Sequence, residues 1–249
     1  VLSVVTMFVF FAIMFYLTFF FQGVQGKTAI ATGLALLPLT AIFTIASPLA
    51  GWTTERLGSR GTVLIGAGAV TASLVMLLGL EIESSVLALA PALLLAGAGA
   101  GFLLVPAINL VVGSAPEQQS GVASGIQQAI QQLGGTLGIA VFGSIISSTV
   151  ARTFGQAVRD TSAPADLATA LGGDGDVKES IALGFPVDAQ ERLREQIGDP
   201  LAAEVTAAAH QTFLNGLDTV FTVAIVTVLA AAVLSVFVKA PRKDQQGRT

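Results

Sequence analysis

The chain has 249 residues, of which 53% are hydrophobic and only 11% are charged. A soluble domain carries about 25% charged residues, so this composition excludes an ordinary soluble globular protein. The net charge is −4, and no basic patch with interleaved aromatic residues occurs, so we expect no nucleic-acid partner. With no cysteine and one histidine, the sequence has no cluster with metal-ligand spacing, and we expect neither a metal nor a cofactor.

Six stretches of the chain contain no Asp, Glu, Lys or Arg. They are 1–26, 28–54, 61–80, 84–116, 118–151 and 219–238. About 20 helical residues cross roughly 30 Å of hydrocarbon, so each stretch is long enough to cross a lipid bilayer. The fold class that this predicts is all-α integral membrane, a six-transmembrane-helix bundle. The expected spans are 2–21, 30–50, 62–80, 86–111, 120–148 and 213–238.

One long connection, 151–212, interrupts this pattern with ten acidic and five basic residues and several Pro and Gly breakers. We predict an acidic, water-exposed loop outside the cytoplasm, with short surface helices near 188–197 and 201–210. The single histidine, His210, is expected to be an ordinary residue of this loop. The last residues, 239–249, form a cytoplasmic tail.

Orientation follows from Lys and Arg in the short connections, which favour the cytoplasmic side. The turn at 51–61 contains Arg56 and Arg60, and the tail contains two Lys and two Arg. Six alternating spans place both segments on the same side. We therefore expect a multi-pass protein of the cell membrane whose turn, tail and first residue are cytoplasmic.

The turn itself reads GWTTERLGSRG. Gly51 allows close packing at the end of the second span, and Gly58 supplies the positive φ of a tight turn. Glu55 is expected near the start of the next helix, paired with Arg56 or Arg60. Two interpretations remain open: a gating loop that locks one arrangement of two helix bundles, or a short cytoplasmic loop with ordinary topological arginines.

The pattern G-x-x-x-E-R-x-G-x-R resembles the signature loop of the major facilitator superfamily. The stretches 15–38 and 96–144, the latter with P-x-x-x-SGVASG and QLGG-x-x-G elements, are similar to the carboxyl half of the fourteen-span drug:proton antiporters. Glu55 replaces the commoner Asp, and Gly61 stands where a second basic residue is usual. The resemblance implies half of a major facilitator fold, spans nine to fourteen, and a missing amino-terminal half that precedes Val1.

Polar and small residues share one face of the fifth span, opposite a face of Val, Leu and Ile. The amides are Gln127, Gln128, Gln131 and Gln132, and the glycines include Gly121, Gly125, Gly134, Gly135 and Gly138. An amide facing lipid loses hydrogen bonds at a cost of roughly 2–7 kcal/mol, so this face must meet protein or water. It serves either interhelical packing through the Gly-x-x-x-Gly pairs, or the lining of a substrate pathway, or both.

The first and fourth spans carry further candidates for the pathway. Tyr16 and Gln22 lie near the outer end of the first span, and Asn109 lies near the inner end of the fourth, after Pro106. The resemblance implies that these two spans line the cavity of the bundle. Tyr16 and its neighbouring phenylalanines either stack on a flat lipophilic cation or form an interfacial aromatic belt.

The function that we expect is export of drugs or other lipophilic small molecules in exchange for protons, by alternating access. Asp218 is the single acidic residue near a span interior, and it is either a proton site or an anion tolerated at the outer interface. We expect the titrating group in the missing half. The alternatives are export of one endogenous metabolite or antibiotic, and a membrane scaffold or sensor. No arrangement of catalytic residues occurs, so we expect no enzyme.

Overall fold

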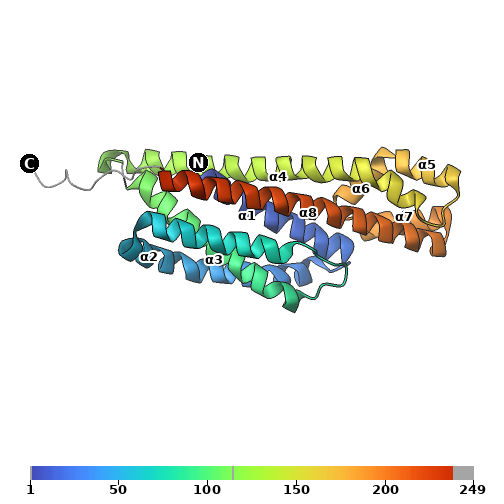
Figure 1. The fold of residues 1–249 in the computed structure, drawn as a ribbon, viewed down its shortest axis with the longest axis horizontal. Coiled ribbons are helices and arrows are strands. Elements are labelled where there is room, and N and C mark those ends of the chain that lie inside the picture. Colours follow the sequence, from blue (N-terminus) through green and yellow to red (C-terminus); the bar gives the residue numbers. More distant parts are fainter. Residues whose placement is uncertain (1, 114, 238–249) are drawn as a thin grey trace, which may run out of the picture.

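The computed structural model describes residues 2–113 and 115–237, and five of its helices are long and apolar enough to cross a membrane (Figure 1). This confirms the predicted all-α membrane bundle. The five helices are α1 (Leu2–Phe19), α2 (Ala29–Leu77), α3 (Val86–Val112), α4 (Ser120–Arg159) and α8 (Asp199–Phe237). Two short elements extend α1 and precede α4: the π-helix η1 (Phe20–Val24) and the 3₁₀ turn η2 (Glu117–Gln119).

Helix α2 folds back on itself at Gly58, so the five helices provide six membrane passes. Gly58 has φ 75° and ψ 164°, a conformation that only glycine adopts readily. The two arms run antiparallel and occupy the places of the second and third predicted spans (Figure 1). Hydroxyl groups join the arms beside the hinge, where the Oγ1 atoms of Thr54 and Thr62 lie 3.1 Å apart.

Alternating glycines of α3 pack this helix closely against both arms of α2. A Cβ atom added at Gly97 would overlap the carbonyl oxygen of Leu39 on the first arm. A Cβ at Gly99 would lie 2.8 Å from the carbonyl oxygen of Gly66 on the second arm. Because neighbouring small residues let helix backbones approach, the run AGAGAG (96–101) fixes the position of α3 between the two arms.

Helices α4 and α8 are about twice as long as a membrane pass. With 40 and 39 residues at 1.5 Å each, they measure roughly 60 Å, whereas the hydrocarbon layer is about 30 Å thick. Both extend from the bundle at the end opposite the α2 hinge (Figure 1). Three short helices connect them: α5 (Ala165–Gly173), α6 (Gly175–Ala182) and α7 (Val187–Ile197).

Residues 151–212 therefore form a helical cap, which is more helical than the water-exposed loop that we expected. Helix α7 takes the place of the short helix expected at 188–197, whereas residues 201–210 belong to the long helix α8. The hydrophobic interior of the cap continues the core of the bundle, and Phe154, Ile181 and Val205 are fully buried in it. Pro164, Pro186 and Gly198 separate the short helices, as breakers should, but the charged residues lie mainly on the outer surface of these helices.

Candidate functional site

The hinge of α2 holds the residues of the signature turn. Gly58 has the positive φ that we expected, and the side chains of Glu55, Arg56 and Arg60 are exposed. We expected Glu55 to pair with Arg56 or Arg60, and Arg56 forms no ion pair with it. Instead, the guanidinium of Arg56 lies 3.8 Å from the ring centroid of Trp52, one turn earlier, in a cation–π contact.

One expectation for this turn needs correction. Gly51 does not serve close packing, since a Cβ atom there would meet nothing within 4 Å. Sequence reasoning also missed the threonines that tie the hinge together. Thr62 is fully buried, and its hydroxyl also donates to the carbonyl of Gly58 over 3.2 Å. The sequence could have predicted the contact between Thr54 and Thr62, because these residues lie at equal distances along the chain on either side of the turn at Gly58.

The amide face of α4 divides into a buried strip and an exposed strip. Gln127 is 3% exposed, and its Nε2 donates to the Oγ of Ser3 on α1 over 2.8 Å. On the same strip, a Cβ at Gly134 would lie 2.6 Å from the carbonyl oxygen of Val4, and one at Gly138 would overlap that of Phe8. Gly135 lies against Phe11 in the same contact. These residues pack α4 against α1, as the packing interpretation predicts.

The other strip is covered by no element of the chain that the structure describes. Gln128 and Gln132 are exposed, and Gln131 is half-buried at the border. Gly121 and Gly125, which we expected to pack against a neighbouring helix, have nothing within 4 Å of an added Cβ. The opposite face exposes apolar side chains suited to lipid: Val122, Ile126, Leu133 and Leu137. The exposed polar strip is therefore a second, separate surface of α4.

The pathway candidates on α1 and α3 are not brought together. Tyr16 is 3% exposed, and its hydroxyl donates to the carbonyl of Ile139 on α4 over 2.8 Å. Its hydroxyl is thus used within the bundle, which contradicts an open stacking surface at this residue. Gln22 lies in η1 and is half-buried, whereas Asn109 is exposed near the other end of the bundle, on the last turn of α3.

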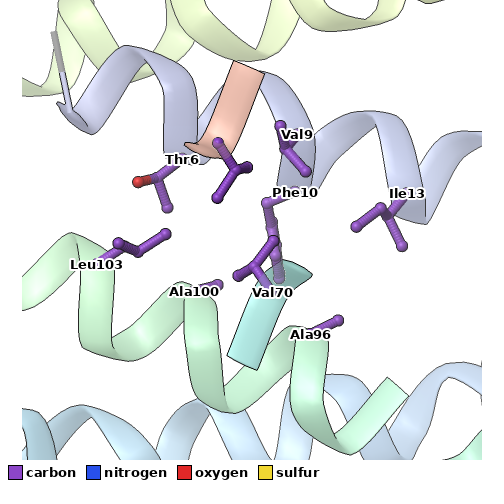
Figure 2. Close-up of a pocket in the computed structure, with 9 residues that line it drawn as sticks. Thr6, Val9, Phe10, Ile13, Val70, Ala96, Ala100 and Leu103 are labelled. Atoms are coloured by element: carbon purple, nitrogen blue, oxygen red, sulfur yellow. The ribbon is translucent and has the colours of Figure 1, made fainter. Parts of the chain in front are cut away.

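The apolar cavity in the middle of the bundle is too small for a drug-sized molecule. The cavity between α1, α2, α3 and α8, shown in Figure 2, holds only about 10 Å³. Its lining is apolar except for Thr6, whose hydroxyl donates to the carbonyl of Leu2 over 2.9 Å. This cavity therefore cannot serve as a substrate site.

Asp218 lies at the cap end of the bundle and makes a structural contact. Its Oδ1 accepts a hydrogen bond of 3.0 Å from the backbone N–H of Gly79, in the turn between α2 and α3. The hollow beside it, of about 560 Å³, is also lined by Glu81, Glu83 and Gln211. Among the described residues, no group of His, Asp and Glu is placed to hold a metal ion.

Long apolar helices, a hairpin hinge and an uncovered polar strip define this chain as part of a multi-pass helical membrane protein. Residues 1–139 match the sequence profile of the Major Facilitator Superfamily, which is more than half of the chain. The chain belongs to this family of transporters, in agreement with our expectation that it is no enzyme.

Curated relatives are named for export or resistance. The Tetracenomycin C resistance and export protein of Streptomyces glaucescens is 30% identical over 99% of this chain and 44% of that protein. The Multidrug resistance protein Stp of Mycobacterium tuberculosis is 38% identical over 55% of this chain and 25% of that protein. The Dehydrocurvularin exporter of Aspergillus terreus is 25% identical over 95% of this chain and 38% of that protein. The chain thus spans less than half the length of these relatives.

Proposed function

We propose that this chain is the carboxyl half of a proton-coupled exporter of drugs or other lipophilic small molecules. The observation that carries the proposal is the similarity of almost the whole chain to a longer protein named for resistance and export. The cap fits the long connection expected before the last span of the fourteen-span antiporters. The small size of the interior cavity between α1, α2, α3 and α8, about 10 Å³, supports a substrate pathway between two bundles.

The exposed strip of α4 is where the partner bundle would lie. Amide groups at membrane depth need hydrogen-bond partners, and the neighbouring glycines Gly121 and Gly125 leave room for another helix backbone. An amino-terminal half packed on this strip would satisfy Gln128 and Gln132. Relative movement of the two halves would then open the pathway alternately to each side of the membrane.

The test measures dye retention in cells of a host that lacks its own efflux pumps and expresses the full-length gene. Cells that express the gene should retain less lipophilic cationic dye than cells with the empty vector, and an uncoupler should restore retention. Dye export that continues undiminished in the uncoupler would overturn the proton coupling. Equal retention with and without the gene, for dyes and antibiotics alike, would instead favour the scaffold or sensor.

We also propose that the hinge of α2 is a cytoplasmic gating loop. The exposed Glu55, Arg56 and Arg60 stand at the hairpin of two membrane passes, where a contact with the other half changes as the halves move. Replacing Arg56 and Arg60 together by Ala should slow export while the amount of inserted protein stays the same. Normal turnover in this double variant would leave the arginines with a topological role only.

A second candidate function is export of one natural product. Two of the relatives are named for a single compound each, which favours a dedicated exporter over a broad one. The two candidates differ in range: a dedicated exporter protects the host against one chemical class and leaves unrelated dyes inside the cell.

A further inference from the structure

The cap is fastened to the end of α1 by an unusually close backbone contact. At this end α1 widens into the π-helix η1, a feature that often marks functional positions. The cap turn at Gly184 lies directly on η1: a Cβ added at Gly184 would be 2.6 Å from the carbonyl oxygen of Phe19, and one at Gly23 would be 2.5 Å from that of Gly184. Gly184 itself has φ 84°.

The next residue of the turn is also constrained. Phe185 has φ 51°, the only positive φ of a non-glycine residue in the part of the chain that the structure describes. Such a conformation is strained for a residue with a side chain and persists where surrounding contacts enforce it. Here Phe185 is 2% exposed in the cap interior, and its ring lies at 74° to the ring of His210, with the centroids 6.3 Å apart.

One amide group connects the cap turn, η1 and His210. The Nε2 of Gln190 on α7 donates to the carbonyl of Phe185 over 2.8 Å and lies 3.5 Å from the carbonyl of Gly23. These two carbonyls fix which end of the amide faces them. The same Nε2 lies 3.4 Å from the Nε2 of His210, which is 6% exposed. Because an amide nitrogen carries only N–H groups, this contact is attractive only while the Nε2 of His210 is unprotonated.

We propose that His210, Gln190 and the Gly184–Phe185 turn form a latch, which holds the cap on the end of α1 at neutral pH and releases it when the medium on the cap side becomes acidic. A protonated ring would direct an N–H group against the amide N–H of Gln190. The Gln190 side chain would then have to leave the carbonyls of Phe185 and Gly23, and the contact between cap and η1 would open.

No charged side chain among the described residues takes part in the contact between His210 and Gln190. The elements packed on this part of α8 carry the following charged residues: Asp176, Lys178 and Glu179 on α6, Asp188, Glu191, Arg192, Arg194 and Glu195 on α7, Arg152 and Arg159 on α4, and Asp199, Glu204 and Asp218 on α8 itself. Within the described residues, none of them is recorded in an ion pair or hydrogen bond with His210. Asp188 pairs with Arg192, Arg194 with Asp199, Glu204 with Ser162, and Asp218 with Gly79.

The direction of the pH effect follows from the burial of His210. This residue precedes the charge-free part of α8 and so lies in the cap, outside the membrane. Burial lowers the pKa of His210 below its ordinary value of 6.5, and this outweighs the opposing effect of the Phe185 carbonyl. The docked cap therefore binds fewer protons than the open cap. Its stability is complete above pH 6.5 and falls as the pH drops from 6.5 towards the lowered pKa.

Hydrogen–deuterium exchange of the full-length protein in lipid nanodiscs tests the latch. Labelling times are scaled so that the intrinsic chemical exchange is equal at pH 7.5 and pH 5.5. Protection of peptides covering 20–27 and 183–190 should fall several-fold at pH 5.5. One proton with an undocked pKa of 6.5 limits the change to about tenfold. Peptides from α3, which contains no titratable side chain, should keep their protection.

The matched control moves the histidine by one position. Gln211 is exposed, so the double variant His210→Gln, Gln211→His keeps the composition but removes the imidazole from the latch. Its protection at 20–27 and 183–190 should no longer depend on pH. A pH dependence equal to that of the wild-type protein would overturn the proposal. If the variant does not fold, the wild-type measurement still tests the proposal, because unchanged protection of the wild-type peptides at pH 5.5 would also overturn the latch. The experiment measures no transport, so its outcome is independent of the proposed export.

Discussion

Gly58 is the residue on which the hairpin of α2 depends. Its φ of 75° and ψ of 164° lie in a region that residues with a side chain avoid, whereas no atom lies within 4 Å of an added Cβ. Gly58→Ala should therefore act through backbone strain alone and lower the free energy of unfolding by about 1–3 kcal/mol. Thermal unfolding of the purified full-length protein measures this effect.

Gly51→Ala is the control for the hinge. Gly51 belongs to the same turn and also has open space around it, but its backbone is helical. Alanine there should leave stability unchanged or raise it slightly, because Ala is the better helix former. Equal losses in the two variants would contradict the assignment of strain to Gly58.

At the residue scale, the sequence predicted backbone requirements better than side-chain partners. The turn pattern was sufficient for Gly58, because positive φ is a local property. The partner of Tyr16 is the carbonyl of Ile139, 123 residues away, and no local pattern shows that approach. Gln127 and Gln128 are neighbours in sequence, yet one is buried against α1 and the other is exposed, because adjacent helical residues point about 100° apart.

At the scale of elements, the glycines of α3 give the sharpest prediction. Gly97 lies against the backbone of Leu39, so the added methyl group of Gly97→Ala cannot be accommodated by a side-chain rotation. The two helices must separate, and we expect destabilisation of about 1–3 kcal/mol, as for other overpacked cores. The control is Gly68→Ala on the second arm of α2, where an added Cβ meets nothing within 4 Å. A lower unfolding temperature for Gly68→Ala than for Gly97→Ala would contradict this packing.

The lengths of the charge-free stretches predicted the membrane helices, but no sequence pattern predicted the helical cap. Hydrophobic periodicity and breakers indicated only short surface helices between 151 and 212. The long extensions of α4 and α8 depend on packing with each other and with α5, α6 and α7 around residues such as Phe154 and Val205. The burial of His210 could not be predicted either, because nothing in the sequence around a single polar residue of an acidic segment indicates that the cap interior buries it.

At the scale of the whole molecule, the sequence left open whether the amides of the fifth span pack against another helix or line a substrate pathway. The structure assigns packing to Gln127 and leaves Gln128 and Gln132 on a surface that the described chain does not cover. Both interpretations thus apply to different strips of one helix. On our proposal, the amino-terminal half would cover this strip of amides.

The effect of removing this strip is a prediction about the assembled protein. Gln128→Leu with Gln132→Leu in the full-length gene should leave polar groups of the partner bundle without hydrogen bonds, at about 1–3 kcal/mol. Since 1.4 kcal/mol corresponds to a factor of ten, we expect export to fall roughly tenfold at equal amounts of membrane-inserted protein. Ile126→Leu with Leu133→Ile changes the lipid-facing strip of the same helix and should export normally. Matching export rates in the two double variants would mean that the strip meets no partner, and the exposed amides would then face water in every state of the transport cycle.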